Sequence, residues 1–144
     1  MRVPRAEADA ITAHALAGYP FEVCGVLLGR NGDPRGARVE RAVQVVNREE
    51  ETPRVRYQIA PEDLIRIQRE ARDAGLEILG YYHSHPDHPA RPSETDRRMA
   101  AEGLSDGMIY VVVGVAEGKR TEPTAWVFRD ALQGFEPEPY VVIG

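Results

Sequence analysis

The chain has 144 residues, of which 42% are hydrophobic and 28% charged, a balance typical of one folded globular domain over residues 1–144. Its formal net charge of −5 disfavours a nucleic-acid-binding protein, which usually presents a basic face, so we expect no nucleic acid partner. Cys24 is the only cysteine, which excludes an intramolecular disulfide and a cysteine-based structural zinc site.

The first third of the chain predicts a helix followed by a β-hairpin. Residues 5–17 place apolar side chains on one helical face, and the Gly-Tyr-Pro stretch at 18–20 ends that helix. The apolar run at 22–29 shows little polar alternation, which is typical of a buried strand. A segment rich in turn formers at 31–36 connects it to a second strand at 37–47.

The middle of the chain predicts a strand, a helix and a further strand. Residues 55–60 alternate well enough for a short strand. The segment 61–75 begins with Pro61, carries acidic residues in its first turn and ends at Gly75, as helices commonly do. The apolar stretch at 76–85 predicts a strand that runs directly into two histidines.

Three prolines keep residues 86–92 out of regular structure, and a helix is expected at 93–103. Three apolar segments then predict strands at 108–116, 122–129 and 139–144. Helices mixed with strands along one length predict an α/β fold, with a single mixed β-sheet flanked by helices. No apolar run approaches the ~20 residues that would cross a bilayer, so we expect a cytoplasmic protein without a membrane partner. No feature of the sequence predicts the oligomeric state.

The residues with the clearest chemistry are His83 and His85. Side chains two apart on a strand point to the same face, with Cα atoms roughly 6.5 Å apart, so both imidazoles can reach one metal ion. A catalytic metal needs a third protein ligand and an open position for water. Asp96 can supply the third ligand if the proline-rich loop folds the next helix back over the strand end.

Each candidate also has an ordinary structural explanation. Ser93 and Asp96 form an S-x-x-D pattern that would cap a helix, and capping competes with metal binding or catalysis for the same side chains. Glu22, by its position alone, reads as a solvated carboxylate at a strand end. His88 and Asp87 are interpreted as loop residues, and Cys24 as a small buried hydrophobic side chain rather than a nucleophile.

Taken together, the polar positions resemble a known signature. Glu22 before the Cys24–Gly29 strand, then His83-Ser84-His85-Pro86, then Ser93-Glu94-Thr95-Asp96, is similar to the motif of the JAMM/MPN+ metalloproteases. The resemblance implies a JAMM/MPN architecture, which is cytidine-deaminase-like, with Zn²⁺ bound by His83, His85 and Asp96. It also implies that Glu22 acts as the general base on the metal's water and that Ser93 donates a hydrogen bond to the oxyanion.

The same resemblance implies the substrate class. It predicts a peptidase or isopeptidase that hydrolyses the amide bond after the C-terminal Gly-Gly of a ubiquitin-like or sulfur-carrier protein. The short connections between elements are similar to the compact prokaryotic forms and favour a sulfur carrier over ubiquitin chains.

Three alternatives follow from the same sequence. A non-catalytic MPN-type scaffold would bind no zinc. A zinc deaminase would need an H-x-E and a P-C-x-x-C motif, and a chain with one cysteine has neither. A DNA-associated relative would show a different histidine motif without the upstream glutamate.

Overall fold

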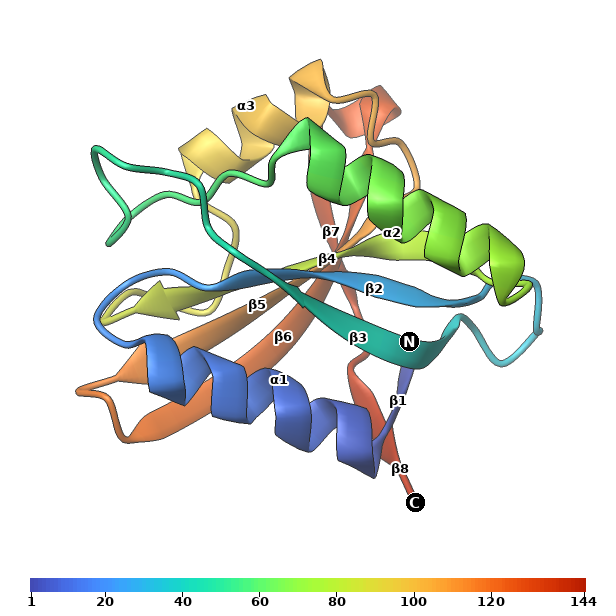
Figure 1. The fold of residues 1–144 in the computed structure, drawn as a ribbon, viewed down its shortest axis with the longest axis horizontal. Helices are drawn as coiled ribbons and strands as arrows, with labels where there is room; N and C mark the ends of the chain where they lie inside the picture. The colour runs from blue at the N-terminus through green and yellow to red at the C-terminus, as the bar shows by residue number, and fades with distance from the viewer.

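The computed structural model describes residues 1–144 as one mixed sheet of eight strands with three helices (Figure 1), in the strand order β7-β6-β5-β4-β2-β3-β1-β8. The helices are α1 (Arg5–Gly18), α2 (Pro61–Asp73) and α3 (Glu94–Glu102), with a 3-10 turn η1 at Asp130–Leu132. The strands are β1 (Arg2–Pro4), β2 (Cys24–Arg30), β3 (Arg38–Val45), β4 (Glu77–Pro86), β5 (Ile109–Ala116), β6 (Arg120–Arg129), β7 (Gly134–Glu138) and β8 (Val141–Ile143).

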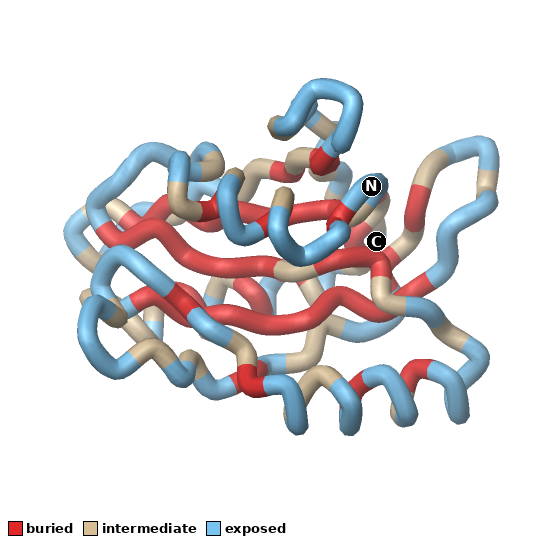
Figure 2. The backbone as a smooth tube through the Cα atoms, turned by 90° about the horizontal axis from the view of Figure 1, so that it is seen from above, coloured by how far each residue is buried: buried red, intermediate tan, exposed pale blue.

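Helices cover both faces of the sheet, α1 on one side and α2 with α3 on the other (Figure 1). The face under α1 holds one apolar cluster of 17 buried residues. The opposite face holds two smaller clusters, of 7 residues on the α2 side and 3 on the α3 side. Figure 2 shows the buried residues concentrated along the strands between these layers. No helix is long and apolar enough to cross a membrane.

Strand β4 lies in the middle of the sheet and carries the two histidines. It pairs antiparallel with β2 and parallel with β5, and helix α3 forms part of the crossover between β4 and β5. β2 in turn pairs antiparallel with β3, which confirms the predicted hairpin. A residue near the end of β4 is therefore surrounded by backbone on both sides, and its side chain is buried wherever a helix or loop covers that face.

A β-bulge in β4 decides which side chains share a face with the histidines. Leu27 of β2 pairs with Gly80 while Leu28 pairs with Ile78, so one extra residue, Leu79, is inserted. Gly80 has φ +159°, and a Cβ there would lie 1.7 Å from the carbonyl oxygen of Ile109. The bulge places Leu79 and Tyr82 toward α1. Tyr81, His83 and His85 then face α2 and α3.

The predicted strand at residues 55–60 is wrong, because this segment has no ladder partner. The side chain of Asn47 satisfies its backbone instead: Nδ2 donates to the carbonyl of Arg56 at 3.0 Å, and Oδ1 accepts from the amide of Gln58 at 3.0 Å. An asparagine that bonds to the main chain replaces a sheet ladder in this way. The prediction from pattern also missed β1, η1 and β7, which are short or contain prolines.

Candidate metal centre

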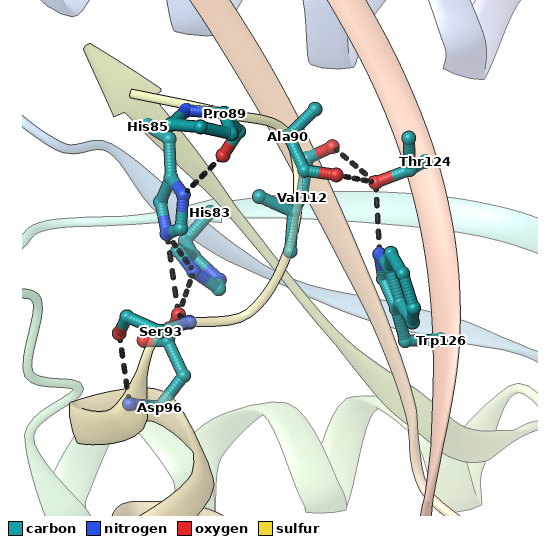
Figure 3. Close-up of polar contacts among 9 residues, drawn as sticks. All are labelled: His83, His85, Pro89, Ala90, Ser93, Asp96, Val112, Thr124 and Trp126. Carbon is teal, nitrogen blue, oxygen red and sulfur yellow. Dashed lines mark hydrogen bonds and ion pairs between the residues drawn. The ribbon is translucent and has the colours of Figure 1, made fainter. Parts of the chain in front are cut away.

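Two imidazoles meet at the end of β4. His83 and His85 lie on the same face of the strand, with 0% and 6% of their surface exposed. Their Nε2 atoms are 3.1 Å apart (Figure 3). Two protonated rings would repel at this distance, so the two imidazoles are not both charged. Their Nε2 atoms are close enough to bind one cation together.

Asp96 completes a triangle with the two histidines. Its Oδ2 atom lies 3.1 Å from Nε2 of His83 and 3.2 Å from Nε2 of His85 (Figure 3). Zinc in four-coordinate geometry, with bonds of about 2.0–2.1 Å, places neighbouring ligand atoms roughly 3.3–3.4 Å apart. The three atoms therefore already have nearly the spacing of one face of a zinc tetrahedron, and small outward shifts would admit the ion.

Helix α3 begins at this site with a complete capping box. The amide of Asp96 donates to Oγ of Ser93 at 3.1 Å, and the amide of Ser93 donates to Oδ2 of Asp96 at 2.8 Å. Capping and convergence on the histidines thus occur together, whereas the sequence suggested that they would compete. They coexist because the carboxylate oxygen has two lone pairs, and because the Ser93 hydroxyl accepts in the cap while its proton stays free to donate.

The neighbouring loop fixes the orientation of His85. Its Nδ1 lies 2.9 Å from the carbonyl oxygen of Pro89, so Nδ1 carries the proton and Nε2 presents a lone pair to the triangle. The loop is held in turn by β6, where the Thr124 hydroxyl donates to the carbonyl of Ala90 at 2.6 Å and accepts from Trp126 (Figure 3). This chain of contacts holds the ring in the tautomer that a metal ligand needs.

On its Nδ1 side, His83 is held by packing rather than by a hydrogen bond. Its Nδ1 is buried and has no partner in the chain. Tyr57 stacks on the ring instead, with centroids 4.6 Å apart and planes 24° from parallel. Tyr57 lies in the irregular segment whose backbone is bound by the Asn47 side chain. A residue outside any recognisable motif therefore fixes the position of the His83 ring in the triangle.

Glu22 reaches the triangle from the chain just before β2. Three hydrogen bonds fix its backbone segment: its amide donates to Pro53, its carbonyl accepts from Asn47, and the amide of Val23 donates to Oγ of Ser84. Ser84 is the residue between the two histidines, and its side chain points to the opposite face of β4. The same short stretch of β4 therefore presents the ligand candidates and positions Glu22.

The Glu22 carboxyl is buried without a partner. Its side chain is 4% exposed and Oε1 forms no hydrogen bond. Its ligand oxygen and one ring nitrogen from each of His83 and His85 all lie within 4.8 Å of one another. Burial raises the pKa of Glu22 to about 8, an effect reduced by His85 and increased by Asp96. This carboxyl is set to take up and release a proton near neutral pH.

The charges of the triangle depend on each other. Burial acts to raise the pKa of Asp96, but His83 and His85 together hold the pKa well below its usual range. Burial lowers the pKa of His83. Burial also acts to lower the pKa of His85, but the contacts with Asp96 and the Pro89 carbonyl raise it overall. Asp96 is therefore anionic, as a carboxylate ligand of a cation must be.

The other polar candidates take the places expected for them. Cys24 is fully buried beside His83 in the sheet register, and burial raises the pKa of its thiol to about 12. It is an inert core residue. Asp87 and His88 are exposed in the loop after β4, where Asp87 accepts hydrogen bonds from the Tyr19 hydroxyl and the Glu117 amide.

Comparison with known proteins decides the family. Residues 4–129 match the model that describes the prokaryotic homologs of the JAB domain. The chain belongs to this family. A desampylase of Haloferax volcanii is 37% identical over 108 residues, covering 72% of this chain and 73% of that protein. A CysO-cysteine peptidase of Mycobacterium tuberculosis is 32% identical over 129 residues, covering 90% and 83%.

A solved structure confirms the fold class. A JAB1/MPN domain protein from Archaeoglobus fulgidus superposes with a TM-score of 0.63 over 100% of both chains, at 17% identity. The expected mixed sheet flanked by helices is thus the fold of the JAB1/MPN domain.

Sequence reasoning missed four residues that support the site of this JAB-family protein: Asn47, Tyr57, Ser84 and Thr124. Only Ser84 had a signal, since it lies inside the His-x-His motif and must point away from the two imidazoles. The other three act through contacts between segments distant in sequence, which no local pattern reveals.

Proposed function

We propose that this JAB-family protein is a zinc-dependent peptidase or isopeptidase that hydrolyses the amide bond after a C-terminal Gly-Gly of a ubiquitin-like or sulfur-carrier protein. The observation that carries the proposal is the pairing of two features at one spot. The ligand atoms of His83, His85 and Asp96 form a triangle of 3.1–3.2 Å edges, and the unpartnered carboxyl of Glu22 lies beside it.

The donor set supports zinc as the ion. Two neutral imidazoles and one carboxylate are ligands that zinc accepts, and three protein ligands leave a fourth position open, as in catalytic zinc sites. The buried, anionic Asp96 also gives the site one negative charge against the cation. When bound, zinc lowers the pKa of its water to about 7 and polarises a carbonyl.

Two side chains of the protein then have separate roles in the reaction. Glu22 takes a proton from the attacking water and carries it to the nitrogen of the leaving amine. The Ser93 hydroxyl, which accepts in the helix cap, keeps its own proton to donate to the oxygen of the attacked carbonyl.

The substrate class is supported by the relatives. The relatives include a desampylase and a peptidase named for CysO-cysteine. A further relative, from Thermus thermophilus, is described as a probable protease that cleaves conjugates of TtuB with proteins. A Gly-Gly tail suits a buried metal site, because glycine has no side chain that would clash with the residues around the site.

The decisive experiment presents the zinc-loaded protein with Gly-Gly-ending ubiquitin-fold proteins from the same organism, each extended by one amino acid or joined to lysine. Mass spectrometry follows the loss of the extension. Cleavage that stops on addition of a chelator and returns with zinc is expected, with Glu22→Gln as the matched control that binds zinc without cleaving. A protein that purifies without zinc and cleaves none of the substrates would instead be a scaffold, and the proposal would be wrong.

A further inference from the structure

A cavity beside the site has an unusual lining for an enzyme that acts on a flexible peptide tail. It has a volume of about 360 Å³, and Glu22, His85 and Ser93 lie along it. Val55, Pro89 and Pro92 are its apolar lining residues, and the other seven of the ten are polar or charged. Arg56, His88 and Arg91 also line it, and Glu22 is the only acidic residue.

The two arginines are free to bind a ligand. Seven of the 17 arginines form ion pairs within the chain, and Arg56 and Arg91 are among the ten that do not. The seven are Arg2, Arg35, Arg38, Arg48, Arg66, Arg97 and Arg129. No side-chain hydrogen bond engages Arg56 or Arg91 either. They come from two separate segments, one before α2 and one in the proline-rich loop, so the fold brings two unpaired guanidinium groups to one cavity.

We propose that Arg56 and Arg91 bind the α-carboxylate of the leaving group, which makes a single free amino acid the preferred group removed from the Gly-Gly end. This inference rests on the proposed function. Water adds to the glycine carbonyl carbon, the C–N bond breaks, and the amine of the amino acid takes the proton that Glu22 carries. The products are the carrier with a free Gly-Gly carboxylate and one amino acid.

The chemistry of the cavity separates this leaving group from a protein lysine. Guanidinium groups match the planar geometry of a carboxylate and bind it in bidentate fashion. A lysine released from an isopeptide bond would instead place four methylene groups and a neutral backbone in the cavity. Val55 and the rings of Pro89 and Pro92 can contact the methylene groups, but a lysine leaves both arginines without an anion.

The test compares three substrates that share one Gly-Gly-ending carrier protein. The first carries a C-terminal amino acid with a free carboxylate, and the second carries the same amino acid as its carboxamide. The third is joined through an isopeptide bond to the side chain of Nα-acetyl-lysine amide. Zinc-loaded enzyme is assayed on each by mass spectrometry, and kcat and KM are determined separately.

We expect wild-type enzyme to cleave the free acid with a kcat/KM roughly 10- to 100-fold above that of the carboxamide, mainly through KM. Arg56→Gln with Arg91→Gln should abolish this preference while zinc content stays at one ion per chain. Arg98→Gln is the matched control, since Arg98 lies in the neighbouring cavity and not in this one. It should keep the preference.

Two results would overturn the inference alone: equal cleavage of acid and carboxamide by the wild type, or faster cleavage of the isopeptide. A double arginine variant that keeps the full preference would also overturn it. Failure of zinc-loaded enzyme to cleave any of the three would contradict the proposed function itself, so the two failures are distinguishable.

Discussion

The metal triangle and the Glu22 corner of the site are built differently, although their atoms lie within a few ångströms of one another. His83, His85 and Asp96 fall within 13 residues of sequence, on one strand and the first turn of the next helix. Glu22 comes from the segment just before β2, and the contact that positions it joins Val23 to Ser84 across 61 residues. The triangle is a local structure, and the position of Glu22 depends on the tertiary fold.

This difference predicts how the triangle and Glu22 each respond to substitution. The triangle atoms contact each other, so removal of one leaves the other two with an incomplete ligand set. Glu22 contacts no side chain through Oε1, so it can be neutralised without disturbing the triangle. Substitutions should therefore separate zinc binding from proton transfer.

The largest expected effect tests this separation directly. His83→Ala and Asp96→Ala should lose both zinc and hydrolysis, because two remaining ligands do not hold the ion. Glu22→Gln should keep one zinc per chain and lose hydrolysis by about 10²- to 10⁴-fold, the usual contribution of a general base. Metal analysis beside a kinetic assay checks both. Full activity in Glu22→Gln, or the loss of its zinc, would contradict the separation of zinc binding from proton transfer.

The second effect is the pH dependence of stability without metal. The neutral form of Glu22 is favoured in the folded protein, because its pKa is raised from 4.5 to about 8. Its contribution to the free energy of unfolding is therefore present below pH 4.5 and lost as the pH rises to about 8. Glu22→Gln has no charge at this position. In the presence of chelator, its free energy of unfolding should therefore rise relative to that of the wild type over this range, by about 4 kcal/mol at pH 8.

Urea unfolding of both proteins in chelator, at pH 5 and pH 8, measures this difference. The two free energies of unfolding should differ by about 1 kcal/mol or less at pH 5 and by about 4 kcal/mol at pH 8. A constant difference between the variants across the range would show that Glu22 does not titrate in this interval.

Ser93 tests whether cap and catalysis are separate properties of one hydroxyl. Ser93→Gly should leave stability within a few tenths of a kcal/mol, since glycine is tolerated at an N-cap, whereas Ser93→Ala should cost about 1 kcal/mol. Both lack the hydrogen-bond donor and should lower kcat by roughly 10²- to 10³-fold. Thermal unfolding and kcat are measured together. Normal kcat in the glycine variant would limit Ser93 to capping.

The smallest effect concerns the packing of His83. Tyr57→Leu removes the aromatic face on which the imidazole stacks and should weaken zinc affinity by about tenfold, as loss of ligand support commonly does. Tyr57→Phe keeps the stack and should bind zinc like the wild type. Competition with a chromogenic chelator measures the affinities. Equal affinities in the two variants would show that the sheet alone orients His83.

The local parts of the fold and site could be predicted because short-range rules govern them. The two-residue repeat of a strand places His83 and His85 on one face, and an S-x-x-D pattern begins α3. The hairpin of β2 and β3 follows from turn chemistry between apolar runs. The segment at 55–60 was mispredicted, because its alternation was local and the Asn47 side chain that satisfies its backbone lies 9 to 11 residues away.

The sequence by itself determined the pair of histidines and the cap that brings Asp96 to the start of α3. It also excluded a cysteine-based zinc site. These depend on backbone periodicity and on composition, which act between near neighbours. Only the tertiary structure decided that Glu22 is buried beside the histidines, that Tyr57 stacks on His83, and that Arg56 and Arg91 line one cavity. Those placements result from sheet order and loop contacts, because burial and charge proximity join residues that the chain keeps apart.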